Sequence, residues 1–482
     1  MRLRDLALVL DPEAKEPLQL QIVRAVTAAI QGRRILPGTA LPGSRQLAEE
    51  LGVHRNTVVL ALQRLEAEGW IEARPNRGTF VAERLPDQAP GATPAGTPAP
   101  EVPGFDLPSG LDPLTGPAPA RLDLGEGLPD PRLAPMEALA KAYQRALRRH
   151  GDTLLATGEP KGNGHLRATL ADFLTERRGL RVDPEQVLVT RGSRMGFDLM
   201  CMALLKRGGA VAVENPGNPA LCAALRRMPG VTVEPVPVDR EGLRIEALEA
   251  VLARTPVRFL YLTPQHQFPT TVALSAARRT QLLELARHHR MALLEDDYDA
   301  EYHYSGGPQL PLASADPTGQ VVYMGSISKL LAPGVRLGFL VAPRGLVDRL
   351  GRVRAVLDRQ GDRVLEWAVG DLIRDGDLAR HIRRARRLYQ ERRDRMAGLL
   401  GEHLEGRLTF TLPEGGMALW AEPAAGFDLE AWIGRCRGQN LVLNPGRVYN
   451  VDGQPLAGTR IAFAELEAEE AQEAVRRMVL SL

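Results

Sequence analysis

The chain has 482 residues, of which 44% are hydrophobic and 25% charged, and its formal net charge is +2. This length exceeds one ordinary hydrophobic core, so two or more domains are expected, and the balanced charge means that any nucleic-acid contact must come from a local patch. Its three cysteines, Cys201, Cys222 and Cys436, lack the spacing of a zinc site or of a disulfide framework. No apolar run reaches membrane-spanning length, no signal peptide opens the sequence, and a cytoplasmic location is predicted.

Residues 1–84 carry the pattern of a small helical unit followed by two strands. Apolar residues recur at helical spacing from Leu18 to Ile30. Ser44 is predicted to cap a second helix, Arg45 to Leu51, and Gly52 is predicted to end it.

A third helix is predicted to start near Asn56 and to run to Gly69. Two helices joined by a tight turn form a helix-turn-helix, which presents the first turn of its second helix to the major groove of DNA. Arginine pairs with guanine edges, asparagine with adenine edges, and threonine reaches phosphate or a thymine methyl group. The side chains in and before this turn are His54, Arg55, Asn56 and Thr57.

Two alternating strands, 70–74 and 79–82, flank a short turn and predict a wing. Its tip carries Arg77 and Gly78, a cation and a flexible residue that suit contact with the DNA backbone or the minor groove. Because small helical bundles with polar turns are common, such a bundle is the alternative interpretation. The joint occurrence of the helix-turn-helix and the wing favours DNA binding.

This segment resembles the winged-helix domain of the GntR family of transcription regulators. The similarity is carried by 19–22, 41–45, 52–58 and 77–81. It implies that the domain binds double-stranded operator DNA. The residues that fall where the family contacts DNA are Ser44, Arg45, His54, Arg55, Asn56, Thr57, Arg77 and Gly78.

Residues 85–120 are rich in Pro, Ala, Gly and Thr. Such a composition buries too little apolar surface to order itself, and its prolines keep it semi-extended. The segment is therefore predicted to be a linker that tethers two domains. The alternative is a folded loop that packs against the second domain.

From residue 121 onward, apolar strands alternate with helices, which predicts a mostly parallel sheet covered on both faces. The turn 190–195 follows one strand and opens a helix, where backbone amides suit a phosphate group. The predicted strands are 187–190, 210–213, 259–262, 292–294 and 321–324.

Lys329 is the leading candidate for the functional centre because it closely follows the buried strand 321–324. Withdrawal from water lowers the pKa of an amine, and the free base condenses with an aldehyde to a Schiff base. Ser326, Ser328 and Arg336 lie near it and are residue types that hold a phosphate. A lysine beside a phosphate cradle suggests pyridoxal phosphate, although a lysine that caps a turn is the plainer alternative.

A pyridoxal site also needs a carboxylate on the pyridine nitrogen. Asp296 ends an apolar strand, and Tyr298 falls on the same face because strand side chains alternate. Both stand at the carboxyl end of a strand, where open α/β sheets bind ligands. His266 follows another strand and either bonds a ring oxygen of the cofactor or is a satisfied loop histidine.

These turns resemble the large domain of fold type I aminotransferases, and the whole chain is similar to the MocR subfamily of GntR regulators, to which GabR belongs. The resemblance implies a winged helix-turn-helix (α+β) domain, an α/β transferase-like large domain over 121–345 and a smaller α+β domain over 346–482. By motif position, Lys329 is the Schiff-base lysine, Asp296 the partner of the pyridine nitrogen and Tyr298 a donor to the ring oxygen. Arg460 falls where the family binds a substrate carboxylate. The phosphate-binding positions are Ser193, Arg194, Ser326, Ser328 and Arg336.

Two residues depart from the pattern. Asn218 stands where the family usually has an aromatic residue stacked on the cofactor ring, and Thr271 stands where a glycine commonly follows Pro-Thr. Loss of the ring argues against efficient transamination. In addition, 380–395 is rich in arginine at helical spacing, which predicts either a solvated face paired with acids or a track for DNA phosphates.

Together these features predict a cytoplasmic regulator that depends on pyridoxal 5'-phosphate and reads operator DNA as a homodimer. It would sense an amino compound or pyridoxal phosphate itself through an aldimine at Lys329, with the carboxylate of an amino acid drawn to Arg460. A catalytically active aminotransferase with a structural N-terminal domain is the alternative. Neither the effector, the operator nor the direction of regulation follows from the sequence.

Overall fold

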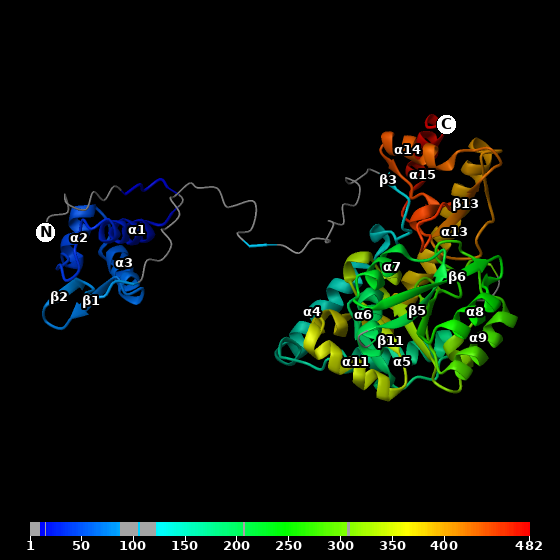
Figure 1. Cartoon of the computed structure of the whole chain (residues 1–482), viewed down its shortest axis with the longest axis horizontal. Coiled ribbons are helices and arrows are strands. Elements are labelled where there is room, and N and C mark those ends of the chain that lie inside the picture. Colours follow the sequence, from blue (N-terminus) through cyan, green and yellow to red (C-terminus); the bar gives the residue numbers. More distant parts are fainter. Residues whose placement is uncertain (1–9, 15, 87–104, 107–121, 206–207, 306–308) are drawn as a thin grey trace. The chain divides into compact units, whose positions relative to one another are not determined.

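The computed structural model describes residues 10–14, 16–86, 105–106, 122–205, 208–305 and 309–482. The chain divides into two compact units, 1–113 and 114–482, drawn in Figure 1. The division falls inside the stretch that the composition predicts to be a linker, most of which lies outside the described residues. Among the described residues, no helix is long and apolar enough to cross a membrane.

The first unit is a helix-turn-helix followed by a two-stranded antiparallel wing. Its apolar core includes Ile22, Ile30, Val58 and Leu65, each at most 2% exposed. This core forms because the apolar faces of all three helices turn inward. The elements are α1 (Leu18–Gln31), α2 (Ser44–Leu51), α3 (Arg55–Ala67), β1 (Ile71–Arg74) and β2 (Gly78–Val81).

Two details at the helix starts differ from the prediction. Helix α2 begins at Ser44, and Gly43 occupies the N-cap position, so the prediction that Ser44 caps this helix is wrong. The Ser44 hydroxyl instead accepts a hydrogen bond from Nε of Arg55 at 3.4 Å. Helix α3 begins one residue earlier than predicted, because the ring of His54 caps it by accepting from the amide of Asn56.

The second unit contains an eight-stranded sheet in the order β4-β11-β10-β9-β8-β5-β6-β7. All five predicted strands are present. Adjacent strands of this sheet run parallel, except that β11 is antiparallel to both β10 and β4 and β7 is antiparallel to β6. The strands are β4 (Val187–Thr190), β5 (Gly209–Asn215), β6 (Val231–Asp239), β7 (Gly242–Leu243), β8 (Val257–Leu262), β9 (Ala292–Asp297), β10 (Val321–Ser326) and β11 (Gly338–Val341).

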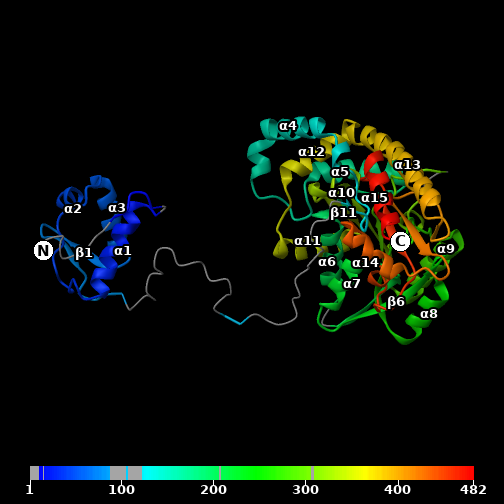
Figure 2. The same cartoon turned by 90° about the horizontal axis from the view of Figure 1, so that it is seen from above.

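Helices cover both faces of this sheet. One apolar cluster joins α6, α7 and α11 to one face, and a second joins α8 and α9 to the other. Figure 2 shows α4, α12 and α13 along one side of the unit. The helices are α4 (Met136–Leu155), α5 (Gly164–Arg178), α6 (Gly192–Leu204), α7 (Pro219–Arg226), α8 (Ile245–Arg254), α9 (Ala276–His289), α10 (Ile327–Leu330), α11 (Arg344–Leu357) and α12 (Arg363–Arg374).

The C-terminal part is a small α+β layer, whose α14, α15 and β13 gather at one end of the unit in Figure 1. Strand β3 (Leu122–Asp123), the first strand described after the predicted linker, pairs with β14 of this layer. The layer therefore holds both ends of the second unit. Its elements are α13 (Asp377–His403), β12 (Leu408–Phe410), β13 (Ala418–Pro423), α14 (Leu429–Gly438), β14 (Leu441–Val442), β15 (Thr459–Ala462) and α15 (Ala468–Leu480).

The arginine-rich stretch forms the middle of α13, as predicted. Its members divide by burial: Arg392 and Arg393 are buried, and Arg387 lies 3.6 Å from Glu391. The remaining arginines on its solvent face are Arg380, Arg383, Arg384, Arg386 and Arg395. The buried pair belongs to the protein interior and cannot contact DNA.

Candidate functional site

Lys329 lies in the short helix α10, directly after β10. The Ser326 hydroxyl caps this helix by accepting from the Lys329 amide at 3.3 Å. The side-chain amine is half-buried and donates to the carbonyl oxygen of Gly127 at 3.0 Å. Burial lowers the pKa of this amine, and the positive charge of Arg460 lowers it further. A larger fraction of the amine is therefore in the neutral, nucleophilic form than for a surface lysine.

Asp296 lies near the carboxyl end of β9 and is 7% exposed. Its Oδ2 accepts from the hydroxyl of Tyr261 at 2.8 Å, whereas its Oδ1 has no partner among the described residues. Burial raises the pKa of Asp296 to about 7, although the Tyr261 hydroxyl acts in the opposite direction. A buried oxygen without a partner is uncommon in proteins and marks a place for an added donor. A protonated pyridine nitrogen is such a donor.

Tyr298 follows β9, and its ring centre lies 6.0 Å from the Lys329 amine. Its hydroxyl donates to the carbonyl oxygen of His266 at 3.1 Å. His266 itself is buried, and its Nδ1 lies 2.8 Å from Oδ1 of Asp299. Burial opposes a charge on His266, but Asp299 outweighs it and raises the pKa of the ring. Of the two interpretations of His266, these contacts favour the satisfied loop histidine.

The start of α6 and Arg336 together form a corner whose groups suit an anion. A side chain at Gly192, the first residue of α6, would come within 3.4 Å of the Arg336 guanidinium. Arg336 is exposed and also donates to the carbonyl oxygen of Arg191 at 3.4 Å. Ser193 is half-buried in the first turn of α6. Free amides at a helix start and a guanidinium are the groups that bind phosphate.

Two of the predicted phosphate-binding residues have other partners. The Ser328 hydroxyl donates to the carbonyl oxygen of Leu337 at 3.2 Å and accepts from its amide at 2.9 Å. Arg194 is directed to Asp198 at 3.2 Å and to the carbonyl oxygen of Ala220 at 3.2 Å. In this structure the polar atoms of Ser328 and Arg194 are thus bonded to backbone carbonyls, a backbone amide and a neighbouring acid.

Arg460 lies in the middle of β15 and is 1% exposed. Its guanidinium donates to the carbonyl oxygen of Pro269 at 3.1 Å and lies 4.7 Å from the centre of the Phe268 ring. No acidic side chain of the described residues forms an ion pair with it. A buried guanidinium is costly unless paired, and it fits a carboxylate through two parallel hydrogen bonds.

The sequence did not reveal three residues of this site: Tyr261, Asp299 and Gly127. Tyr261 lies in an apolar run of β8, and its hydroxyl group was the only sign in the sequence that it could have a polar role. Gly127 gave no local signal, since it lies 202 residues from Lys329 along the chain. It has φ +70°, and a side chain there would come within 3.3 Å of Nη2 of Arg460.

The two departures from the family pattern have defined positions. The Asn218 side chain caps α7 by accepting from the amides of Ala220 and Leu221 at 3.1 and 3.4 Å. Asn218 therefore serves the helix start where an aromatic ring would stack on a cofactor. Thr271 has φ +65°, a left-handed conformation that glycine adopts without strain and a β-branched residue does not.

In the first unit, the predicted DNA-contacting residues lie at the starts of α2 and α3 and at the wing tip. Most are exposed, and Ser44 and Thr57 are half-buried. Gly78 has φ +101°, which lets the wing turn tightly. The exposed members are Arg45, His54, Arg55, Asn56, Arg77 and Gly78. Cationic and amide side chains at a helix-turn-helix and its wing form a surface suited to DNA.

Two known protein families match the two units. Residues 18–81 match the family described as bacterial regulatory proteins, gntR family, and residues 120–478 match aminotransferase class I and II. The probable rhizopine catabolism regulatory protein MocR of Rhizobium meliloti is 30% identical over 98% of this chain and 95% of its own length. The HTH-type pyridoxine biosynthesis transcriptional regulator PdxR of Corynebacterium glutamicum is 32% identical over 83% of this chain and 82% of its own.

Solved structures match the second unit. The kynurenine aminotransferase of Pyrococcus horikoshii, in complex with PMP, superposes with a TM-score of 0.70 at 29% identity, over 75% of this chain and 90% of its own. LysN of Thermus thermophilus, complexed with N-(5'-phosphopyridoxyl)-L-leucine, gives 0.69 at 31% identity over 75% and 91%. A pyridoxal phosphate group fits three features of this site: the Oδ1 of Asp296 that has no partner among the described residues, the Lys329 amine, and the corner formed by Arg336 and the start of α6. The chain therefore belongs to the aminotransferase class I and II family and is a transcription regulator of the MocR type, with a GntR-family DNA-binding domain and pyridoxal 5'-phosphate as its cofactor.

Proposed function

We propose that this regulator senses an amino compound, or pyridoxal phosphate itself, at a site formed by Lys329 and Arg460. The observation that carries the proposal is the buried guanidinium of Arg460, which forms no ion pair with any described acid. This guanidinium adjoins Gly127, and the carbonyl oxygen of Gly127 accepts from the Lys329 amine. A carboxylate bound to Arg460 would remove the cost of this unpaired buried charge.

The residues of the site have separate roles in holding the cofactor. When bound, pyridoxal phosphate supplies an aldehyde that joins an amine and a ring that withdraws electrons from it. Lys329 provides the amine, and the free oxygen of Asp296 accepts from the ring nitrogen. Arg336, Ser326 and the first turn of α6 with Ser193 would hold the phosphate, and Tyr298 would donate to the ring oxygen. Ser328, Arg194 and His266 are proposed for the same two tasks. The polar atoms of Ser326, Tyr298, Ser328, Arg194 and His266 all have partners within the protein as well.

The ligand acts only if it favours one arrangement of the regulator over another, since equal affinity for two states shifts nothing. Two relatives support different effectors: PdxR is named for pyridoxine biosynthesis and MocR for rhizopine catabolism. An amino acid would use Arg460 for its carboxylate. Pyridoxal phosphate alone would need only Lys329, Asp296 and the phosphate corner.

The first unit would read operator DNA in the cytoplasm. Arg55 and Asn56 stand at the exposed start of α3, where they reach base edges, while Arg45 and Arg77 reach phosphates. Ser44, His54, Thr57 and Gly78 complete this surface. Operators read by helix-turn-helix proteins contain two half-sites that match a two-fold protein, which agrees with a homodimer.

An active aminotransferase is the second candidate function, since the solved relatives of the second unit include aminotransferases. Asn218 speaks against it, because its side chain caps α7 and presents no ring to the cofactor. The intact and exposed DNA-reading surface also favours the regulator.

Absorbance of the cofactor-loaded full chain tests the sensing proposal. Added amino acids, such as glycine, glutamate and 4-aminobutyrate, should change the cofactor band of the wild type, and Arg460→Met should weaken this response at least about tenfold, because one charge-assisted pair is lost. Arg278→Met, which removes a half-buried arginine paired with Asp239, is the matched control. If Arg460→Met responds as the wild type does, Arg460 has no part in sensing. Rapid conversion of amino acids to keto acids, with no binding to DNA upstream of its own gene, would favour the enzyme.

A further inference from the structure

Residues 122–133, here called the strap, join the cofactor site to the start of the second unit. The strap follows directly on the predicted linker in the sequence. At its beginning, β3 runs parallel to β14, and the Leu124 amide donates to the carbonyl oxygen of Val442 at 3.0 Å. The Leu124 carbonyl accepts from the amide of Ala462 in β15 at 2.9 Å. The strap is therefore built into the C-terminal layer beside the strand that carries Arg460.

The middle of the strap touches both functional side chains at one residue. The carbonyl oxygen of Gly127 accepts from the Lys329 amine at 3.0 Å. On the other side, a Cβ on Gly127 would lie 3.3 Å from Nη2 of Arg460 and 3.4 Å from Cβ of Ala418. Because Lys329 holds the strap through one hydrogen bond of a flexible side chain, this contact is easily exchanged.

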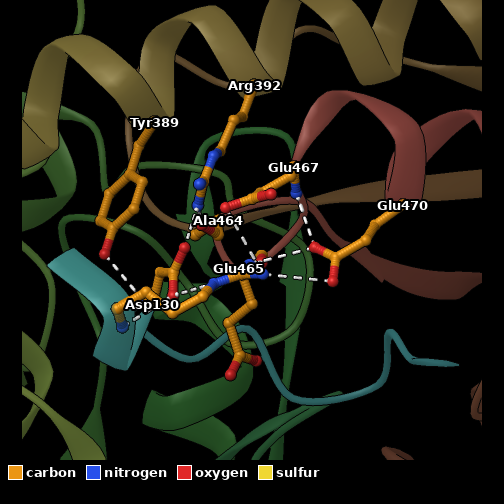
Figure 3. Close-up of polar contacts among 8 residues, drawn as sticks. Asp130, Tyr389, Arg392, Ala464, Glu465, Glu467 and Glu470 are labelled. Atoms are coloured by element: carbon orange, nitrogen blue, oxygen red, sulfur yellow. Dashed lines mark hydrogen bonds and ion pairs between the residues drawn. The ribbon is translucent and has the colours of Figure 1, made fainter. Parts of the chain in front are cut away.

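The far end of the strap is held at Asp130, which is 1% exposed (Figure 3). Its amide donates to the hydroxyl of Tyr389 at 2.9 Å, and its Oδ2 accepts from Nη1 of Arg392 at 2.8 Å. Both partners come from α13. Its Oδ1 accepts from the amide and from Nε of Arg132, at 3.0 and 2.9 Å. Burial opposes the charge on Asp130, but the two arginines outweigh it and lower the pKa of this carboxyl group.

Arg132 extends this anchor to α15. Its guanidinium binds both carboxylate oxygens of Glu470, at 3.2 and 3.0 Å. Glu470 in turn accepts from the amide of Glu467 at 2.8 Å and completes the capping box of α15. In Figure 3, Tyr389 and Arg392 extend down from α13 toward Asp130, and Glu467 and Glu470 lie to the right of these residues. The anchor thus joins the strap to two helices of the C-terminal layer.

We infer that Asp130 is a positioning residue, which fixes the end of the strap so that Gly127 reads the state of Lys329. The inference rests on the proposed function, because it assumes that the amine leaves Gly127 when the cofactor engages it. A strap held firmly at Asp130 and at β3 responds to the loss of that one contact between its two anchors.

Amide hydrogen exchange of the full chain, with and without pyridoxal 5'-phosphate, tests this inference. In the wild type, loading should speed exchange at residues 125–130 about fivefold, because the Lys329 contact is lost. In Asp130→Asn, exchange should be fast before loading and change less than about twofold on loading, since a charge-assisted anchor is already broken. The cofactor absorbance band should persist in this variant, because Lys329, Asp296 and Arg336 are unchanged.

Asp239→Asn is the matched control. Asp239 also pairs with an arginine, Arg278, and accepts from a backbone amide, that of Glu241, but it lies on β6. It should respond to loading as the wild type does. Should Asp130→Asn fail to fold, Tyr389→Phe removes only the hydroxyl that holds the Asp130 amide and should reduce the response in the same direction.

The possible outcomes separate the strap from the cofactor assignment. A purely structural role for Asp130 would speed exchange equally with and without cofactor, which leaves the fivefold response intact and overturns the inference. A normal cofactor band with no change in wild-type exchange at 125–130 would also overturn it. Absence of a cofactor band in the wild type would instead contradict the proposed function. In that case, equal exchange at 125–130 in the unloaded Asp130→Asn variant and the unloaded wild type would overturn the positioning role as well.

Discussion

The hydroxyl of Tyr261 donates to Oδ2 of Asp296 at 2.8 Å, from the neighbouring strand β8. Both residues are buried, so this bond acts in a region of low dielectric, where it stabilises the charged carboxylate strongly. It also fixes the carboxyl group so that Oδ1 remains free. The pair therefore determines both the charge and the direction of the acceptor presented to a cofactor ring.

Replacing Tyr261 by Phe should weaken the binding of pyridoxal phosphate about tenfold, because a hydrogen bond to a charged group contributes about 1.5–3 kcal/mol. Loss of the donor should also raise the pKa of Asp296 further. Titration of the apoprotein with cofactor, followed by absorbance, measures the change. Tyr143→Phe, a half-buried tyrosine of α4, is the control and should bind normally. Equal affinity in both variants would show that Tyr261 does not support Asp296.

Replacing Asp296 by Asn should stabilise the cofactor-free protein above neutral pH. Burial raises the pKa of Asp296 to about 7 from its ordinary 3.8. The folded state therefore binds a proton more tightly than the unfolded state, and wild-type stability falls as pH rises from about 4 through 7. Asparagine carries no charge, so the variant should gain on the order of 4 kcal/mol relative to wild type at pH 8 and little at pH 4, because the two pKa values differ by about three, at about 1.4 kcal/mol each.

Urea unfolding of both apoproteins at several pH values measures this difference. The carboxyl group of Glu295, with its pKa raised to about 7 mainly by burial, titrates in both proteins and cancels in the comparison. Burial also raises the pKa of Glu214 to about 7, and the charge of Asp296 adds to this, so the pKa of Glu214 should fall in the variant. A variant less stable than wild type at pH 8 would contradict the prediction. Asp296 is also the residue proposed to accept from the ring nitrogen. Asp296→Asn should therefore bind the cofactor more weakly while the cofactor-free protein is more stable.

Replacing Thr271 by Gly should stabilise the second unit by about 1 kcal/mol, because a left-handed conformation costs about 1–2 kcal/mol for residues with a side chain. Thr271 has φ +65°, and its amide donates to the carbonyl oxygen of Gln267 at 2.7 Å, a bond that glycine retains. Thermal unfolding measures the change. Thr270→Gly is the control: it removes the hydroxyl bonded to Gln267 Oε1 at 2.6 Å and should destabilise.

Replacing Asn56 by Ala should weaken binding to operator DNA by about 1–3 kcal/mol and relax sequence preference, whereas Arg77→Ala should lower affinity for all sequences and reduce the salt slope by about one. Both residues are exposed. Fluorescence anisotropy with operator and unrelated DNA at several salt concentrations separates the two effects. Arg64→Ala, on α3 and paired with Glu68 at 3.0 Å, is the control. An unchanged sequence preference in Asn56→Ala would remove Asn56 from base recognition.

Particular residues show how far sequence reasoning reached. The five apolar strands were predictable because an uninterrupted apolar run such as 187–190 buries all of its side chains only in a sheet that is covered on both faces. Asp296 and Lys329 were predictable because an acid and a lysine at the ends of such strands must lie at one edge of the sheet. Strands β6, β7 and β11 were missed. Pro235 and Pro237 interrupt β6, and β7 and β11 are runs of only two and four residues, which resemble any buried segment.

Local interactions misled the prediction that Ser44 caps α2. Gly43 occupies the N-cap position, and the hydroxyl of Ser44 accepts from Arg55. The hydroxyl of Ser328 bonds Leu337, a partner that the sequence did not indicate. A hydroxyl rotates to its best partner, and that partner is fixed by elements elsewhere in the chain. His266 was left open between two roles for the same reason, and Asp299 decided its contacts.

The sequence by itself determined the family and the two functional halves, and it predicted Lys329 as the reactive lysine, because these depend on local patterns of apolar strands, turns and charged residues. Only the tertiary structure decided that Gly127 lies between Lys329 and Arg460, that Tyr261 supports Asp296, and that Asp130 joins the strap to α13. These contacts join residues 35 to 333 positions apart. Their formation depends on how packed layers meet, which no local pattern of residues records.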